Sequence, residues 1–571
     1  MTGFLQKIRS SQSHIHWFQL SIVSLFILIF LGTRLLWLGN LPAGLHADEA
    51  SFLLNSVSLL ETGKDEDGNV YPIWLSSYID SKPALYSYFQ IPSIAVLGTN
   101  TFSSRLPAVA ASAVSLIIFY LLAKQWLTKE QSLVLSTVLL LSPWHIVVSR
   151  STQEVIVSFT FSLATILLFE LLHKKKTNRL QTILVAGAAC LFALLAMYMY
   201  HAAKVFLPAL LLSWTFFDYF ETKKIHVSRT VVSMSVALLM LGLTFGLAQS
   251  TERFQAIGIF SDQGYRLISN EQTLTASNVT PLFFIRAFYN KVVTTVLAIG
   301  SLYTQHFTAD FLFWKGGEPQ RYLIPYHGLM YHVELFLLPA GMFFGLHTKK
   351  TRTRSLKMLI WLLLAPLPAA LTTQEIPSMI RSFFMIVPLT FFVWIALLEI
   401  WKYRAKWFRK ILMFCVFLGY IWGFAYFIQQ SVVQQPRYHP WNRNQADTNL
   451  TNRLLEIQDN YDKIIVTTNR DLYAYLTLAQ QDMIPYLQEV SSTRKAETFT
   501  FGKYHFEPGE CRLTPPEEND TQSILYVIRA GCVLPKSFTH LEYISYNDNA
   551  KEYQLVIYEP LLEDNALTAT Q

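Results

Sequence analysis

Two adjacent carboxylates, Asp48 and Glu49, stand a few residues beyond the first strongly apolar stretch of the chain. Neighbouring side chains diverge by about 100° on a helix and point to opposite faces of a strand, so only one of the pair can face a single reacting atom. The pair therefore suits one general base and one orienting partner. Two other roles stay open: favourable charges at a helix N-terminus, and a shared divalent cation, although no spacing requires a metal.

A lysine with aromatic neighbours follows in the same loop. Lys82 precedes a proline within the run from Tyr78 to Tyr88. Lysine supplies a compact positive charge and tyrosine an interfacial hydrogen bond, so the run suits an anionic lipid headgroup. The plainer alternative is a snorkelling lysine within an aromatic belt at the membrane surface. The charged run 63–68, between the carboxylates and Lys82, is interpreted as a solvated turn.

Further basic residues lie where the outer ends of membrane spans are expected, although cationic residues are usually depleted there. They are Arg34, Arg105, Arg150, Lys204 and Arg381. Ionisable groups at membrane depth are functional candidates, and arginine or lysine stabilises the charge of a departing phosphate. We therefore expect a cavity that binds a phosphate or pyrophosphate. His201, one turn before Lys204, is a further candidate, although a lone histidine is more often a packed or interfacial residue.

The amino-acid composition indicates the class of protein to which these residues belong. Of 571 residues, 52% are hydrophobic and only 15% are charged, against about 25% charged in soluble domains. Residues 431–571 carry 12 Lys and Arg against 19 Asp and Glu, whereas the preceding part carries 34 against 20. A disordered chain and a disulfide-dense scaffold are excluded, and no basic stripe remains for nucleic acid. We predict an α-helical polytopic membrane protein with a small C-terminal α/β domain.

Eleven apolar stretches are candidates for transmembrane helices, which need about 20 residues each. They are 17–39, 106–123, 132–148, 155–172, 180–198, 205–220, 231–248, 328–346, 357–371, 383–400 and 411–429. The predicted domains are a transmembrane domain, 1–430, and a soluble extracytoplasmic domain, 431–571. The first stretch is too long for a cleavable signal peptide, and no small-residue cleavage site follows it.

Short loops rich in lysine and arginine predict the orientation in a cell membrane, because such loops stay cytoplasmic. These alternate loops begin at Lys7, Lys124, Lys174, Lys223, Lys349 and Lys402. The N-terminus is then cytoplasmic, and the long loops 40–105 and 249–327 lie outside together with the soluble domain. This alternation requires segment 291–307 to be a helix along the outer surface rather than a span.

The soluble domain has strand-like runs at 463–467, 524–528 and 553–558 and a helix-like stretch near 471–480, which is typical of a small α/β domain. Cys511 and Cys532 flank a loop on the oxidising side, so we expect a disulfide worth about 3 kcal/mol. Cys190 and Cys415 fall in spans and are interpreted as buried apolar residues. Neither a CxxC pair nor an HExxH motif is present, so no dedicated metal site is predicted.

The order of these motifs resembles that of a large group of membrane glycosyltransferases with a GT-C type fold, which contains protein O-mannosyltransferases and lipid A aminoarabinose transferases. The matching motifs are the Asp-Glu pair, Lys-Pro-x-Leu-Tyr from Lys82, Arg-Leu-Pro from Arg105, and Pro-Trp-His…Ser-Arg ending at Arg150. The resemblance is densest over residues 30–205 and looser to about 430. Ala84 stands where members usually have a second proline.

The resemblance implies a transferase that uses a sugar carried on a polyprenyl phosphate. Asp48 matches the family's catalytic base, with Glu49 as its neighbour. Lys82, Arg105 and Arg150 match basic residues that hold the lipid phosphate, and Lys204 or His201 would assist them.

One displacement on the outer face would invert the anomeric carbon and move the sugar to a hydroxyl of a glycan, lipid or protein. Because the energy arrives in the lipid-phosphate bond, no nucleotide-binding loop is needed, and no cofactor is implied beyond the open divalent cation. The alternative is a transporter or flippase of lipid-linked sugars. That alternative predicts interrupted spans, internal repeats and charges near the bilayer midplane.

Overall fold

The computed structural model describes residues 23–76, 81–172, 178–245, 258–260, 263–277, 279–480, 482–494, 496–517 and 522–559. By its internal contacts the chain divides into two compact units. The first unit contains residues 1–39 and 105–431, and the second contains residues 40–104 and 432–571. The first long loop thus groups with the C-terminal segment rather than with the helices that flank it. Lys7, Tyr78 and Lys174 lie outside the described residues.

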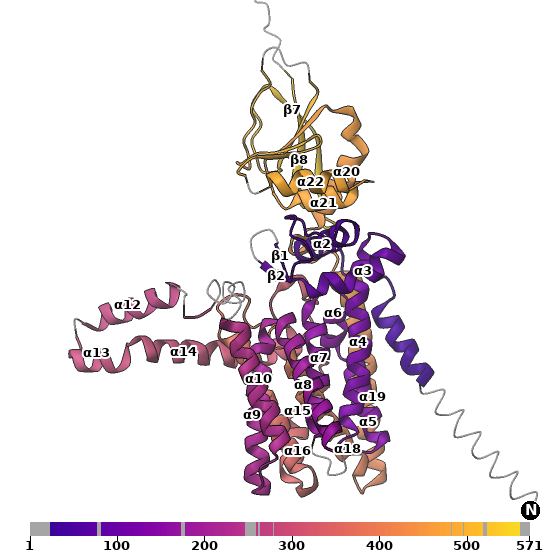
Figure 1. The fold of residues 1–571 in the computed structure, drawn as a ribbon, viewed down its shortest axis with the longest axis vertical. Helices are drawn as coiled ribbons and strands as arrows, with labels where there is room; N and C mark the ends of the chain where they lie inside the picture. Colours follow the sequence, from indigo (N-terminus) through magenta and orange to yellow (C-terminus); the bar gives the residue numbers. More distant parts are fainter. Residues whose placement is uncertain are drawn as a thin grey trace, which may run out of the picture. The chain divides into compact units, whose positions relative to one another are not determined.

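The first unit is built from helices (Figure 1). They are Val23–Arg34, α4 (Thr101–Ala123), α5 (Lys129–Leu141), α6 (Pro143–Ser149), α7 (Glu154–Leu171), α8 (Arg179–Met199), α9 (His201–Thr222), α10 (Val227–Phe245), α12 (Gln263–Ser277), α13 (Leu282–Phe288), α14 (Lys291–Thr304), α15 (Glu334–His347), α16 (Lys349–Leu364), α17 (Leu367–Ala370), α18 (Ile386–Lys402) and α19 (Lys406–Gln429). Capping boxes begin α5 at Thr128 and α8 at Asn178, which satisfies backbone donors at the helix starts.

Among the described residues, seven helical stretches are long and apolar enough to cross a membrane, or eight if the bent pair α5 and α6 forms one span. The predicted class of multi-span membrane protein is confirmed. In that part of the chain, fewer helices than the expected eleven are long and apolar enough to be spans. Val23–Arg34 and α15 are shorter than 18 residues within the described chain. Lys204 and Asp218 interrupt the apolar sequence of α9, and basic residues fill the first turns of α16.

The stretch from α13 through α14 has the length and hydropathy of a membrane span, which was not expected. Leu282–Trp314 passes as a candidate span by length and hydropathy, although residues 291–307 were expected along the outer surface. In Figure 1, α13 and α14 run across the direction of α9 and α10 rather than beside them. The end of α14 packs through Ala298 and Leu302 against Ala370.

The second unit contains a six-stranded sheet of order β4-β5-β3-β6-β8-β7 among its described residues. The strands are β3 (Lys463–Val466), β4 (Phe499–Phe501), β5 (Tyr504–Phe506), β6 (Ile524–Arg529), β7 (Phe538–Ser545) and β8 (Lys551–Tyr558). β3 runs parallel to β5 and β6, and the other pairs are antiparallel. The predicted strands at 463, 524 and 553 and the helix near 471 are confirmed.

The other elements of the second unit come from both of its segments. They are α2 (Ala47–Thr62), β1 (Trp74–Ser76), β2 (Ser81–Pro83), α3 (Leu85–Leu97), α20 (Gln445–Ile457), α21 (Leu472–Ala479) and α22 (Ile484–Thr493). Leu53, Leu54 and Val57 of α2 share one apolar core with α20, α21 and the sheet, and α2 contacts α21 and α22 (Figure 1). The helix that begins with the acidic pair is therefore buried against the C-terminal segment of this unit.

Candidate functional site

The start of α2 sets the position of the acidic pair. His46 is the N-cap residue, and its Nδ1 accepts a hydrogen bond from the Asp48 N–H at 3.1 Å. Glu49 Oε2 accepts from the His46 N–H at 3.2 Å, which completes a capping box. Asp48 and Glu49 are thus consecutive in the first helical turn, where side chains diverge by about 100°.

Asp48 faces a lysine of the same unit. β2, paired with β1 in an antiparallel ribbon, brings the Lys82 ammonium onto the Asp48 carboxylate. The ammonium also lies 5.3 Å from the centroid of the Phe52 ring. The Lys82 side chain is 5% exposed, whereas that of Asp48 is 33% exposed. Asp48 is therefore an accessible carboxylate with a buried cation beside it.

Glu49 faces a different cation and is fully buried. Its Oε2 lies 2.7 Å from Nη2 of Arg443, and the two side chains are 0% and 3% exposed. The adjacent carboxylates therefore point to separate partners, Lys82 and Arg443. No group of three or more His, Cys, Asp or Glu side chains converges as metal ligands in the described chain. This donor set does not fit a cation held between the two carboxylates.

Arg443 and Asn444 also bind the backbone that leads to α2. Arg443 Nε donates to the Ala43 carbonyl at 2.9 Å, and Asn444 Oδ1 accepts from the Ala47 N–H at 3.3 Å. Gly44 has a φ of +79°, and a Cβ there would meet the Arg443 carbonyl oxygen at 2.6 Å. Nothing in the local sequence marks Arg443, because its partner Glu49 lies 394 positions away.

Two further aspartates of the second unit lie close to this site. Asp447 accepts hydrogen bonds from Tyr553 and Asn444, and burial raises its pKa. Asp471 precedes α21, and its pKa rises to about 6 through burial and the charge of Asp447. Lys82 lowers the pKa of Asp471 and Asp48 raises it, so Asp471 lies within electrostatic range of both. Neither aspartate lies in a motif that the sequence marks as a candidate site.

The run 63–68 is not a solvated turn, and that interpretation was wrong. Asp65 and Glu66 are buried. Glu66 accepts hydrogen bonds from Asn55 and Tyr473 and pairs with Arg494 at 3.4 Å. Burial raises the pKa of Glu66, while Arg494 lowers it. The acidic run looked solvated because two of its buried partners, Tyr473 and Arg494, come from the C-terminal segment.

The arginines expected at the phosphate lie in the first unit, at the end of its first helix. Arg105 donates to the Leu38 carbonyl at 3.0 Å, and Arg150 donates to the carbonyls of Thr33 and Leu36 at 2.9 Å each. The last carbonyls of a helix lack intrahelical partners, so cationic donors there stabilise the helix end. Leu38 is ten residues before Asp48, so these contacts hold the chain that enters the acidic loop.

The remaining predicted site residues also lie in the first unit. Lys204 Nζ and His201 Nδ1 are 3.2 Å apart in the first turn of α9. Arg34 donates to the Leu140 carbonyl at 2.7 Å and lies 3.0 Å from His145 Nδ1. The structure therefore brings Asp48, Glu49 and Lys82 together in one unit. It places Arg105, Arg150, Lys204 and His201 in the other.

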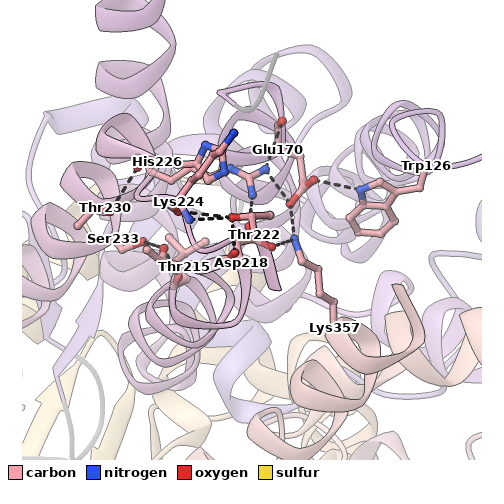
Figure 2. Close-up of polar contacts among 12 residues, drawn as sticks. Trp126, Glu170, Thr215, Asp218, Thr222, Lys224, His226, Thr230, Ser233 and Lys357 are labelled. Atoms are coloured by element: carbon pink, nitrogen blue, oxygen red, sulfur yellow. Dashed lines mark hydrogen bonds and ion pairs between the residues drawn. The ribbon is translucent and has the colours of Figure 1, made fainter. Parts of the chain in front are cut away.

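A second ionic cluster lies among α7, α9, α10 and α16 in the first unit (Figure 2). Lys357 Nζ lies 2.7 Å from Asp218 and 3.7 Å from Glu170, and the Trp126 indole donates to Glu170 at 3.0 Å. Arg229 pairs with both acids, at 3.1 Å for Glu170. Two acids and two bases thus balance in a buried site.

Three members of this cluster, Glu170, Asp218 and Arg229, stand near the ends of α7, α9 and α10, whereas Lys357 lies in the middle of α16. Asp218 is close to the end of α9 and Lys204 is close to its start, about 21 Å apart along the helix axis. Arg229 and Lys357 belong to the basic loops that begin at Lys223 and Lys349 and were expected only to set the orientation. Their acidic partners were missed because helix packing, rather than spacing in the sequence, brings them together.

In the C-terminal segment, Cys511 and Cys532 form the expected disulfide, with a Cα–Cα distance of 5.3 Å. Cys190 is half-buried, and Cys415 is exposed on the surface of the first unit. The described Cys415 thus lies on the outer surface of its helix rather than in the helix packing. A position facing lipid accounts for an apolar side chain there.

Known proteins resemble this chain in sequence and in fold. Residues 81–245 match the family model described as dolichyl-phosphate-mannose-protein mannosyltransferase. The match confirms the resemblance of the motifs over the stretch that contains Lys82, Arg105 and Arg150. None of the curated protein sequences matches the chain.

Two solved structures show the fold. ArnT from Cupriavidus metallidurans, bound to undecaprenyl phosphate, is 10% identical with a TM-score of 0.54, over 95% of this chain and 98% of that one. The oligosaccharyltransferase AglB from Archaeoglobus fulgidus, in complex with an inhibitory peptide and a dolichol-phosphate, is 13% identical with a TM-score of 0.51. That match covers 82% of this chain and 64% of AglB, less than two thirds of its length. The chain has the GT-C fold.

Proposed function

We propose that this protein is a membrane glycosyltransferase that moves a sugar from a polyprenyl phosphate to an acceptor hydroxyl on the outer face of the membrane. The observation that carries the proposal is the different surroundings of the acidic pair. Asp48 is accessible and lies beside Lys82, whereas Glu49 is fully buried on Arg443. Of the two carboxylates, Asp48 is thus the accessible one, and by the order of the motifs it matches the family's catalytic base.

In the proposed step, the Asp48 carboxylate takes the proton of the acceptor hydroxyl. The acceptor oxygen attacks the anomeric carbon, and the bond from that carbon to the phosphate oxygen breaks with its electron pair. Lys82 is the first candidate to stabilise the charge that develops on the departing polyprenyl phosphate. One displacement inverts the anomeric carbon. Arg105, Arg150, Lys204 and His201 remain further candidates for the phosphate, carried over by motif position and by their charge.

The acceptor is a hydroxyl of a glycan, a lipid or a protein. The proposed orientation has a cytoplasmic N-terminus and an extracytoplasmic C-terminal domain, because the short basic loops all fall on one side. The alternative, a transporter or flippase of lipid-linked sugars, predicts ionisable groups near the bilayer midplane. In the buried cluster around Lys357, the other three charged residues stand near helix ends. The cluster is also balanced in charge, which favours the transferase.

Transfer of label from a panel of polyprenyl-phosphate sugars in purified membranes tests the proposal. We expect Asp48→Asn to lower transfer by about 10²- to 10⁴-fold at an unchanged protein level. Asp459→Asn is the matched control, because the Asp459 side chain is 93% exposed. Transfer that survives Asp48→Asn would assign the base elsewhere. Transfer from nucleotide sugars, or translocation of the donor without transfer, would overturn the proposed reaction.

A further inference from the structure

We infer that Arg443 is a positioning residue, which holds Glu49 inside the second unit and thereby directs Asp48 outward. The inference rests on the proposed function, because it assigns a purpose to the orientation of Asp48. Arg443 comes from the segment just before α20, whereas the acidic pair begins α2. Both segments belong to the same compact unit.

Arg443 holds the loop at several points. Nη2 pairs with Glu49 at 2.7 Å, Nε donates to the Ala43 carbonyl at 2.9 Å, and Nη2 also reaches the Gly44 carbonyl at 3.4 Å. Guanidinium has five donors in a rigid plane, so one side chain can bind a carboxylate and a backbone carbonyl together. A lysine at this position could replace the charge but not the geometry.

The backbone of Arg443 fits the loop as closely as its side chain does. Its carbonyl oxygen would lie 2.6 Å from a Cβ at position 44, a distance that no real side chain tolerates. The neighbouring Asn444 accepts a hydrogen bond from the Ala47 N–H, the first residue of α2. Arg443 and Asn444 therefore bind both the residues just before α2 and the first turn of α2.

This contact decides which carboxylate is accessible. Because Asp48 and Glu49 follow each other in one helical turn, fixing Glu49 inward leaves Asp48 about 100° away around the helix axis. Without Arg443, a buried carboxylate would lose its counter-charge, and the first turn of α2 would rotate to bring Glu49 to water, which turns position 48 inward. Asp48 would then leave its place beside Lys82.

Steady-state kinetics of Arg443→Gln, Arg443→Lys, Glu49→Gln and the double variant Glu49→Gln/Arg443→Gln test the inference. We expect turnover to fall about 10- to 100-fold in the two Gln single variants, with the donor KM within about twofold. The double variant should lose no more than the worse single variant, since the pair acts as a unit. Arg443→Lys should keep the protein folded with intermediate turnover. Arg453→Gln is the control and should keep wild-type kinetics, because this partly exposed arginine of α20 pairs with Glu456 and Glu542 rather than with the loop before α2.

Labelling of a thiol at position 48 gives a readout that needs no activity. Asp48→Cys is combined with Cys190→Ser and Cys415→Ser, which leaves Cys511 and Cys532 in their disulfide. We expect Arg443→Gln to slow labelling by a membrane-impermeant maleimide at least about fivefold, and Arg453→Gln to leave it unchanged. If Asp48→Asn retains transfer, the proposed base is wrong, but labelling still tests the geometry. Unchanged labelling and turnover in Arg443→Gln, or losses that simply add in the double variant, would overturn the inference.

Discussion

Lys82 donates a hydrogen bond to the carboxylate of Asp48, which lies 34 positions earlier in the chain. The contact joins the β1–β2 ribbon to the first turn of α2 within one unit. A lysine with three donors can bind a carboxylate and a phosphate at the same time. We therefore propose that Lys82 links the proposed base to the leaving group of the proposed reaction.

Removing the charge of Lys82 should impair both donor binding and turnover. We expect Lys82→Met, which keeps most of the aliphatic stem, to raise the donor KM at least about tenfold and to lower turnover, because the departing phosphate loses a cation. Transfer kinetics in membranes measure both. Lys64→Met is the matched control, because Lys64 is an exposed lysine of the same loop. Equal kinetics in the two variants would exclude Lys82 from the phosphate.

The sequence predicted much of the architecture because its signals are local. Long apolar runs predicted the helices of the first unit, and short strand-like runs, apolar or alternating, predicted β3, β6 and β8. β4 and β5 have three residues each, too few for a periodic pattern. The membership of α2 in the second unit was not foreseen, because its buried face pairs with residues near position 450.

The candidate site, like the fold, could be predicted only where its residues are close together in the sequence. Adjacent carboxylates at Asp48 and Glu49 imply divergent side chains, and the structure gives them different partners. The identity of those partners could not be deduced, since Arg443 lies 394 positions from Glu49. Likewise, helix packing alone places Glu170 beside Lys357.

The cluster around Arg229 should stabilise the first unit without serving the proposed reaction. We expect Arg229→Met to destabilise it by about 3–5 kcal/mol, because two buried acids would keep one cation between them. The double variant Arg229→Met/Asp218→Leu removes one charge of each sign and should recover part of that loss. Thermal unfolding in detergent measures stability, and transfer per folded protein should stay at the wild-type value. A double variant less stable than Arg229→Met would contradict this account.

Asp471 should make the second unit less stable as the pH rises. Its pKa is about 6 in the folded protein and about 3.9 in an unfolded chain. Between those values the folded state keeps a proton that the unfolded state has lost, so the free energy of unfolding falls as the pH rises through that window. The loss is complete above pH 6, amounts to no more than about 3 kcal/mol, and vanishes below pH 4. Asp471→Asn should therefore raise the Tm relative to wild type at pH 7 but not at pH 4.

Melting curves in detergent from pH 4 to pH 8 measure this difference. The exposed Asp459→Asn should follow the wild type throughout. Because the charge of Asp48 raises the pKa of Asp471, the stabilising effect of Asp471→Asn should shrink in an Asp48→Asn background. A constant offset between Asp471→Asn and wild type across the pH range would show that Asp471 does not titrate in this window. An effect of equal size in both backgrounds would show that Asp48 and Asp471 are not coupled.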